Sequence, residues 1–367
     1  MEILIGYGVS FILGITGSII ATELLKKNSQ NKKNKLLEKW EANISEVHAI
    51  QDDREYYQFG PIQIPIIPWL SISESNYKGW LEKDCSFIYN SSYHKVATPE
   101  LETLIDNNWT TELGFNKRLV NEPGVGLLKL SLESKESKIY PKFYLYPTNF
   151  KNFIGTNKSR HRFQNADLNE YHNIEIETPL GYEHLNKSAF SNDLGTATTI
   201  ITKDRKILLS KRTNKVHILP GYIHTSIAEG MNPERDFVID SPSPFETIVK
   251  GAKEELDINI DKKFIRLLAI GIYLPFSQPY IACQIELNKT LNELIEESES
   301  NLNSWEGNIL ACNFTIEDLI PFLISDFESS GIKVAELAKH SILLSLAREF
   351  GFKELITKIN YYQRQMN

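Results

Sequence analysis

Cysteine is scarce in this sequence, and the few cysteines are widely separated. Only three occur in 367 residues, at Cys85, Cys283 and Cys312. An odd number of cysteines so far apart argues against a disulfide framework and offers no spacing for a zinc site. We therefore expect a reducing compartment, with the three thiols acting as small apolar side chains.

An excess of basic residues is also absent. The 40 Lys and Arg residues are outnumbered by 47 Asp and Glu residues, which gives a net charge of −7. Domains that coat nucleic acid are usually strongly basic, so we expect no DNA partner. The sequence has no internal repeat and no Ser-His-Asp or Cys-His arrangement that supports a nucleophile. His217 and His224 have no partner at a useful spacing, and we expect both to be structural.

One long apolar run is present, from Ile3 to Leu25, and only small or hydroxyl residues and Glu23 interrupt it. Its length matches the hydrocarbon core of a bilayer. Lysines follow the run closely, whereas no Lys or Arg precedes it. The positive-inside rule therefore predicts a single-pass signal-anchor at residues 1–27, in contact with membrane lipid, with the N-terminus outside and the rest cytoplasmic.

Small residues recur every four positions within this run, at Gly6, Ser10, Gly14 and Ser18. Such spacing lets two helix backbones approach closely, which predicts self-association through these residues. The alternative is that small residues are simply frequent in membrane helices.

Residues 28–58 are expected to form a connector. Its first part is rich in lysine and has little reason to fold. Apolar residues then recur at three- and four-residue spacing between Leu37 and Val47, which predicts an amphipathic helix. This helix is either a short stalk or packs on the domain that follows.

The sequence of residues 59–194 predicts an α+β region that precedes the core domain, which we call the lead-in region. Three prolines between Phe59 and Ile72 indicate an extended segment at a sheet edge, because proline cannot donate to a strand ladder. Residues 126–132 and 139–146 are typical of strands around a charged turn. The basic run Lys158–Arg162 either meets phosphates or is a solvated loop, and we favour the loop.

Residues 195–367 predict a mixed sheet covered by helices. A helix is expected to begin at Ser243-Pro244, because serine caps well and proline suits the first helical position. Apolar residues then recur at helical spacing as far as Leu256. Strands are expected at residues 197–202, 207–212, 264–273 and 279–287, and a closing helix at residues 334–350.

The end of the first of these helices, Lys250-Gly251-Ala252-Lys253-Glu254-Glu255-Leu256-Asp257-Ile258, resembles the end of the signature of the Nudix superfamily of nucleoside-diphosphate-linked hydrolases. We call this run the box. The family has arginine, glutamate and glycine where this chain has Lys250, Gly251 and Asp257. The resemblance implies a Nudix-like α/β/α sandwich at residues 195–367. The predicted fold class is thus α+β, with a transmembrane helix, the lead-in and this sandwich in order.

The resemblance also implies a site on this helix. Glu254 and Glu255 would be catalytic and would bind Mg²⁺, since carboxylate oxygens suit that cation. Without a glutamate at position 251, the metal would bind weakly and the general base would be Glu229 or Glu246. Gly251 itself has two explanations, which are close backbone packing and room for a large ligand.

Other charged residues near the box are expected to contact a ligand. Lys211 and Arg212 end a core strand and would meet phosphates as a point charge and a fork respectively. Arg235 lies in the long loop before the box helix, and Lys250 and Glu246 lie on the helix itself.

An anchor followed by such a domain resembles the membrane-anchored Nudix-like effectors of bacterial cyclic-oligonucleotide antiphage signalling systems. The resemblance implies that the domain senses a cyclic oligonucleotide messenger made by a partner nucleotidyltransferase. Oligomerising anchors would then disrupt the bacterial inner membrane. The alternative is a membrane-tethered Nudix hydrolase that cleaves a nucleoside-diphosphate-linked or dinucleotide substrate with Mg²⁺.

Overall fold

The computed structural model describes most of the chain after residue 56. The described residues are 57–95, 97–116, 119–136, 138–159, 185–213, 216, 218–297, 307–324 and 333–366. All of them belong to one compact unit, residues 46–367, which contains both the predicted lead-in and the predicted core domain. Several predictions fall outside the described residues: the apolar run with Gly6, Ser10, Gly14 and Ser18, the amphipathic helix after it, His217, and most of the basic run 158–162.

A mixed sheet forms the centre of this unit. Its strands are β3 Ile66–Ser71, β7 Gly195–Ile201, β8 Lys206–Arg212, β9 Ile223–Thr225, β10 Ile227–Gly230, β13 Ile265–Tyr273, β14 Gln278–Glu286 and β15 Gly307–Asn313. The order is β15-β8-β7-β14-β13-β3, with β10 paired to β7 and β9 paired to β8. The β7–β14 pair is parallel and the other pairs are antiparallel. The four strands predicted for this region are confirmed as β7, β8, β13 and β14.

Strands β7 and β8 separate after a short pairing, and β9 and β10 fill the gap between them. The two outer strands pair directly only through Ile200 with Leu208 and Ile201 with Ile207. At the branch point Ser226 Oγ accepts from Ile200 N at 2.8 Å and donates to Leu208 O at 2.5 Å. This hydroxyl satisfies one backbone N–H of β7 and one backbone carbonyl of β8 at the point where the two strands stop pairing. The β9–β10 ribbon, residues 223–230, therefore lies inside the sheet.

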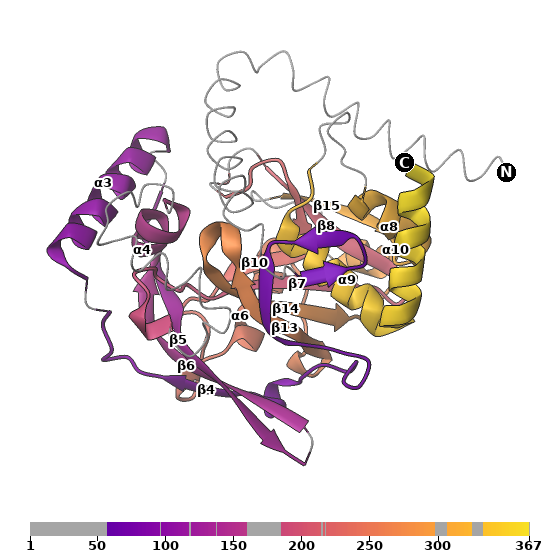
Figure 1. Ribbon diagram of the computed structural model, residues 1–367, viewed down its shortest axis with the longest axis horizontal. Coiled ribbons are helices and arrows are strands. Elements are labelled where there is room, and N and C mark those ends of the chain that lie inside the picture. Colours follow the sequence, from indigo (N-terminus) through magenta and orange to yellow (C-terminus); the bar gives the residue numbers. More distant parts are fainter. Residues whose placement is uncertain are drawn as a thin grey trace. The chain divides into compact units, whose positions relative to one another are not determined.

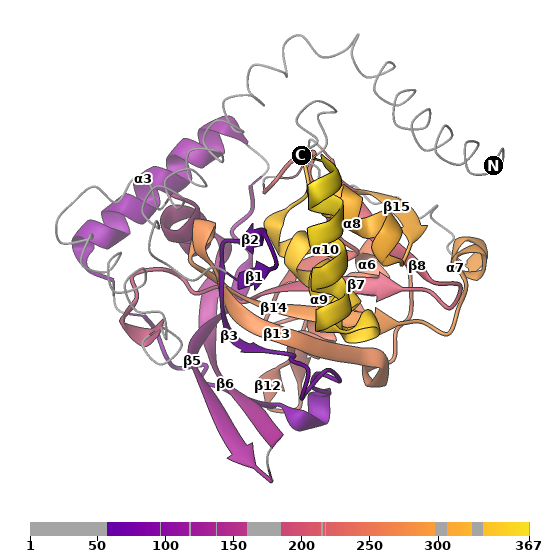
Figure 2. The ribbon, with the colours of Figure 1, turned by 45° about the vertical axis from the view of Figure 1, so that its right-hand side comes forward.

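Helices cover both faces of the sheet. The box helix α6, Pro244–Leu256, packs on β10 and β7 (Figure 1). Helix α9, Glu336–Phe350, packs on the opposite face, where Ser341 Oγ lies 3.0 Å from Thr199 Oγ1. Figure 2 shows α10, Phe352–Met366, alongside α9 and α8, Ile316–Ile324. Helix α9 confirms the predicted closing helix.

The start and end of α6 follow from its local sequence. Ser243 Oγ accepts from Phe245 N at 3.3 Å, and Pro244 opens the helix, as predicted. Its apolar face is buried against the sheet. Asp257 ends it with a φ of 56°, a left-handed conformation that glycine adopts most readily. The backbone N–H of Asp257 donates to Ala252 O and Lys253 O, which closes the end of the helix.

The lead-in region combines a three-stranded sheet with helices. Its elements are β4 Ser86–Tyr89, α3 Pro99–Phe115, β5 Pro123–Lys135, β6 Lys138–Asn149, α4 Phe150–Phe153 and the π-helix η2 Ile154–Lys158. The long β5–β6 hairpin confirms the two strands predicted there (Figure 1). Strand β3, which contains Pro68, is the end strand in the order of the main sheet, as its composition predicts.

Short elements complete the described chain. They are β1 Tyr57–Phe59, β2 Ile62–Ile64, η1 Glu82–Asp84, η5 Leu185–Lys187, β11 Phe237–Val238, β12 Ser241–Pro242, η6 Lys262–Phe264, η7 Leu274–Phe276 and α7 Leu291–Glu297.

Buried hydrogen bonds join the lead-in to the main sheet. Asn157 is fully buried, and its Nδ2 donates to Phe276 O at 2.7 Å and Ser277 O at 3.1 Å. Its Oδ1 accepts from Ser191 N at 3.0 Å. A buried amide with all these partners fixes two distant segments together, because losing any of them leaves a polar group unsatisfied.

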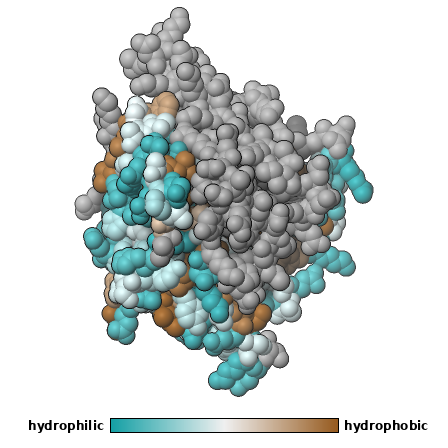
Figure 3. Space-filling model, turned by 60° about the vertical axis from the view of Figure 1, so that its left-hand side comes forward, coloured by the Kyte–Doolittle hydropathy of each residue, from teal (hydrophilic) through white to brown (hydrophobic). Residues whose placement is uncertain are grey.

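The surface of the described residues is mostly polar on the face seen in Figure 3. Where that face is coloured, apolar residues are scattered among hydrophilic ones. Singly exposed apolar residues are normal on soluble surfaces and identify no site.

The predicted fold class and location need correction. No helix in the described part of the chain is long and apolar enough to cross a membrane. A span needs about 20 consecutive, mostly apolar residues, whereas the longest described helix, α3, has 17 and carries polar residues throughout. The prediction of an α+β fold with a transmembrane helix is therefore wrong, and the described fold is mixed α/β. The predicted single-pass location in the inner membrane depended on such a helix, so that prediction is wrong as well.

Candidate functional site

The structure brings Glu229 and Glu254 together through one arginine. Glu229 lies on β10, Glu254 lies in the last turns of α6, and Arg235 lies in the loop between these elements. Arg235 Nη1 donates to Glu254 Oε2 at 3.0 Å and to Glu229 Oε2 at 3.3 Å. The two carboxylates converge on the same guanidinium nitrogen.

Asp236 completes this arrangement, which we call the arginine cluster (Glu229, Arg235, Asp236 and Glu254). Arg235 Nε donates to Asp236 Oδ1 at 2.7 Å, and Nη2 donates to Asp236 Oδ2 at 3.2 Å. The Asp236 side chain is fully buried and also accepts from Thr247 Oγ1 at 2.7 Å. Since Thr247 lies on α6, Asp236 ties the loop, and with it Arg235, to the box helix.

The carboxylates hold Arg235 in its charged form. Burial disfavours the charge, but the hydrogen bond to Asp236 and the charges of Glu229, Asp236 and Glu254 outweigh it and raise the pKa of Arg235 above its ordinary range. Three carboxylates around one guanidinium leave the cluster with an excess of negative charge.

Gly251 allows β10 and α6 to pack closely. A Cβ at this position would lie 2.8 Å from Glu229 Cγ and 3.0 Å from Ile227 Cγ2. The space that a side chain at position 251 would need is thus filled by Glu229 itself. Of the two explanations for Gly251, the structure supports close packing.

The cluster as arranged does not fit a magnesium ion. The guanidinium of Arg235 holds the point where Glu229 and Glu254 converge. Glu255, the second predicted ligand, follows Glu254 on α6 and is half-buried. Among the described residues, no group of three or more His, Cys, Asp or Glu side chains is placed to hold a metal ion.

Glu246 and Lys250 belong to a separate group of charges near the start of α6. Glu246 lies 3.8 Å from Lys250 Nζ and 3.3 Å from Lys262 Nζ, and Lys262 Nζ also lies 3.3 Å from Glu82. Glu246 precedes Glu254 by about two turns, or roughly 12 Å along the helix. The structure therefore does not bring Glu246 to the arginine cluster.

Lys211 and Arg212 lie beside β9, at the β9 end of the β9–β10 ribbon. Lys211 pairs with Ile223 on β9, whereas Glu229 pairs with Thr196 from β10. Because β7 and β8 are antiparallel, and each is antiparallel to its partner in the ribbon, β9 runs toward Ser226 and β10 runs back from it. Ile223 and Glu229 each lie three residues from Ser226, so the predicted phosphate contacts and Glu229 lie toward the same end of the sheet, on different strands.

At the β9 end, residues from three adjacent chain segments form a row of Arg212, Tyr222 and Lys333, which we call the cation row. Arg212 N donates to Tyr222 O at 2.9 Å, and Ile223 N donates to Lys333 O at 2.7 Å. Lys333 Nζ lies 6.0 Å from the centre of the Tyr222 ring. Side chains at neighbouring register positions share a face of a sheet, so the row places two cations beside one tyrosine. Sequence reasoning missed Lys333, because only the fold brings it to β9.

His224, on β9, is buried close to this row. Burial, and then the charge of Arg212, lower the pKa of His224 to about 3. Its Nδ1 accepts from Thr225 N at 2.9 Å. His224 is thus a buried, neutral imidazole that accepts a hydrogen bond from the next residue of its own strand, which agrees with the structural role predicted for it.

Asp193 is a second residue that sequence reasoning missed. Its carboxylate lies against two glycines: a Cβ on Gly124 would be 2.7 Å from Oδ1, and a Cβ on Gly230 would be 3.7 Å from Oδ2. Oδ1 is buried and accepts no hydrogen bond from the described residues. Burial raises the pKa of Asp193 to about 7. No motif marks this residue, because its neighbours come from β5 and β10.

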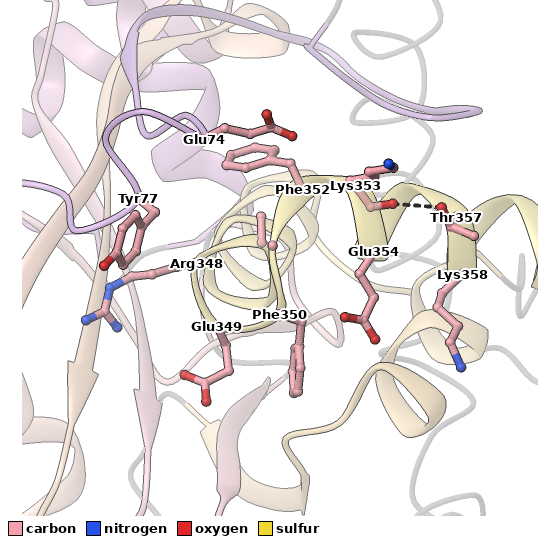
Figure 4. A pocket seen from close by; sticks show the side chains of 12 residues that line it. Glu74, Tyr77, Arg348, Glu349, Phe350, Phe352, Lys353, Glu354, Thr357 and Lys358 are labelled. Carbon is pink, nitrogen blue, oxygen red and sulfur yellow. Dashed lines mark hydrogen bonds between the residues drawn. The ribbon is translucent and has the colours of Figure 1, made fainter.

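A separate cavity of about 710 Å³ lies where α9 meets α10 (Figure 4). Tyr77 and Arg348 are among the residues that line it (Figure 4). Many of its charges are engaged within the protein: Arg348 pairs with Glu286, Glu349 lies 2.8 Å from Arg205, and Lys358 lies 3.0 Å from Glu317. None of the predicted site residues lines it.

Comparisons with known proteins add little. No protein-family model matches the sequence, and no curated protein matches it. A solved structure that resembles it is the crystal structure of DR0079 from Deinococcus radiodurans, with 15% identity and a TM-score of 0.29. The likeness covers 41% of this chain and 80% of that chain. A superposition at that score does not establish a shared fold.

Proposed function

We propose that this domain binds a phosphorylated, nucleotide-type ligand without hydrolysing it, and that the cation row is where its phosphates are recognised. The observation that carries this proposal is the difference in charge between the two strands of the β9–β10 ribbon. Arg212 and Lys333 neighbour Tyr222 beside β9, while Glu229 and Glu254 hold Arg235 beside β10.

Phosphates favour the cation row for electrostatic reasons. Arginine binds phosphate through its planar fork and lysine binds it as a point charge. Arg212 Nε donates to Ile218 O at 3.0 Å, which fixes the direction of this side chain. The arginine cluster, with its excess of carboxylates, repels an anion that arrives without a cation of its own.

The proposed class of ligand comes from the resemblance of the box to the Nudix superfamily, which supports a nucleotide. A cyclic oligonucleotide, made by a partner nucleotidyltransferase, is the member of that class that we propose. Of the residues predicted to contact a ligand, Arg212 keeps this role in the proposal, whereas the side chain of Lys211, the preceding strand residue, points to the other face of the sheet. Arg235, Lys250 and Glu246 are engaged in ion pairs within the protein.

Calorimetric titration of the full chain with cyclic dinucleotides and trinucleotides tests this proposal. We expect binding without release of phosphate when Mg²⁺ is present. Arg212→Gln and Lys333→Gln should each weaken the affinity roughly 10- to 100-fold, the range for losing a hydrogen bond to a charged group. Arg205→Gln is the matched control, because Arg205 pairs with Glu349, a residue of α9 away from the cation row.

Two results would contradict the proposal. One is the absence of binding to any of these nucleotides. The other is Mg²⁺-dependent release of phosphate that Glu254→Gln abolishes, which would support the hydrolase alternative instead.

A further inference from the structure

We infer that Arg235 is a resident replacement for the divalent cation that the Nudix resemblance implies, and that it keeps Glu229 and Glu254 closed to metal. The inference goes beyond ligand binding at the cation row and does not depend on it. The resemblance to the Nudix superfamily implies a metal ion at the box carboxylates. In this structure the guanidinium of Arg235 occupies that position instead.

The acceptors around Arg235 are of the kind that a hard cation takes. They are carboxylate oxygens of Glu229, Glu254 and Asp236, together with Gly230 O, which accepts from Nη2 at 3.2 Å. Magnesium and calcium also bind carboxylate and backbone carbonyl oxygens. Here β10, the loop and α6 each supply acceptors, and one planar group with five N–H donors serves them all.

The loop fixes Arg235 in this place. Asp236 N donates to Asn232 O at 2.9 Å, Ser243 N donates to Asp236 O at 3.1 Å, and Asn232 N donates to Asp236 Oδ2 at 2.8 Å. To withdraw Arg235, the loop would have to break its fork to a fully buried carboxylate. Leaving a buried charge without its partner is strongly unfavourable. The guanidinium is therefore a fixed part of the fold.

Gly251 and Arg235 depend on each other. A side chain at position 251, where the family has a glutamate, would collide with Glu229 Cγ and move Glu229 from its contact with Arg235. The missing carboxylate and the added cation are thus two parts of one arrangement. Losing one ligand weakens a metal site, and the arginine occupies the point where Glu229 and Glu254 converge.

Binding of Mn²⁺ to the full chain, followed by electron paramagnetic resonance, tests this inference. We expect the wild type to show no Mn²⁺ site that depends on Glu254. Arg235→Gln should bind Mn²⁺ roughly 10- to 100-fold more tightly, the range by which neighbouring groups change metal affinity. The double variant Arg235→Gln with Glu254→Gln should lose this gain. Lys253→Gln is the control, because it removes a positive charge from the same helix, where Lys253 pairs with Asp257.

Wild-type binding of Mn²⁺ that Glu254→Gln removes would overturn the inference. So would an Arg235→Gln protein that folds but binds no more Mn²⁺ than the wild type. If thermal unfolding shows that Arg235→Gln does not fold, Arg235→Met, which keeps the apolar stem, replaces it. The wild type compared with Glu254→Gln decides the question in either case. Ligand titration at the cation row remains a separate measurement, so failure of one proposal leaves the other standing.

Discussion

The two strands of the β9–β10 ribbon differ in the charges beside them. At the β9 end, Arg212 and Lys333 lie on either side of Tyr222. At the β10 end, Glu229 and Glu254 share Arg235 with the buried Asp236. The helix at the β10 end resembles a catalytic box in sequence, yet Arg235 holds its Glu254 within the fold. The β9 end carries no motif, and it is where we propose that an anionic ligand binds.

This difference shows why charged residues in a motif need their partners before a role is assigned. A carboxylate that holds an arginine stabilises a loop, whereas the same carboxylate with a metal activates water. Arg235, which precedes the box carboxylates Glu254 and Glu255 by 19 and 20 residues, separates the two cases. We therefore expect substitutions at the β10 end to change stability and those at the β9 end to change binding.

The largest effect on stability is expected for Asp236→Ala. It removes the buried acceptor shared by Arg235, Thr247 and Asn232, and it leaves buried donors unsatisfied. The free energy of unfolding should fall by about 3 kcal/mol or more. Denaturant unfolding of the full chain measures this change.

Asp240→Ala is the matched control for that experiment, because Asp240 lies in the same loop and is exposed. It should change the free energy of unfolding by less than about 0.5 kcal/mol. Equal losses for Asp236→Ala and Asp240→Ala would show that Asp236 does not fix the loop.

Much of the main sheet could be predicted from the sequence, because its signals are local. The cap at Ser243, the proline after it and the apolar spacing up to Leu256 define α6 without reference to any other segment. The strands that became β7, β8, β13 and β14 carry the same kind of local signal. The left-handed turn at Asp257 could not be inferred from the residue itself, because residues other than glycine seldom adopt a positive φ.

The partners within the site could not be predicted, because they are set by contacts between distant segments. The opening of β7 and β8 around residues 223–230 decides that Lys211 and Glu229 lie on different strands that do not pair with each other. The backbone pairing with Ile223 brings Lys333 to β9. Arg235 was singled out as a ligand contact, and only the fold shows that it serves the carboxylates instead.

A smaller effect, dependent on pH, is expected at Asp193. Its pKa is about 7 in the folded protein and about 4 when unfolded. The folded state therefore holds a proton that the unfolded state releases, so this residue lowers stability as pH rises from about 4 to 7. Asp193→Asn should have little effect near pH 4 and should gain about 1–2 kcal/mol at pH 8, by removing an ionised buried carboxylate. Thermal unfolding across this range measures the gain, and a gain independent of pH would contradict the assignment.

His224, at the β9 end, acts in the opposite direction. Its pKa is about 3 when folded and about 6.5 when unfolded. The unfolded state binds the proton first, so His224 lowers stability as pH falls from about 6.5 to 3. The Asp193→Asn protein should therefore still lose stability on the acid side. Asp193 thus lowers stability as pH rises, and His224 lowers stability as pH falls.

The smallest effect is expected for Gly251→Ala, which probes the contact between the box helix and Glu229. Alanine gains up to about 1 kcal/mol of helix propensity over glycine, while overpacking a core costs about 1–3 kcal/mol. The new Cβ would meet Glu229 Cγ at 2.8 Å, so we expect a net loss of under about 1 kcal/mol. Gly114→Ala on α3 is the control: a Cβ there has nothing within 4 Å, so it should stabilise the protein. In a Glu229→Ala background the collision with Cγ disappears while the contact with Ile227 Cγ2 at 3.0 Å stays, so Gly251→Ala should become less destabilising. If its effect is unchanged in that background, Glu229 is not what requires a glycine at this position.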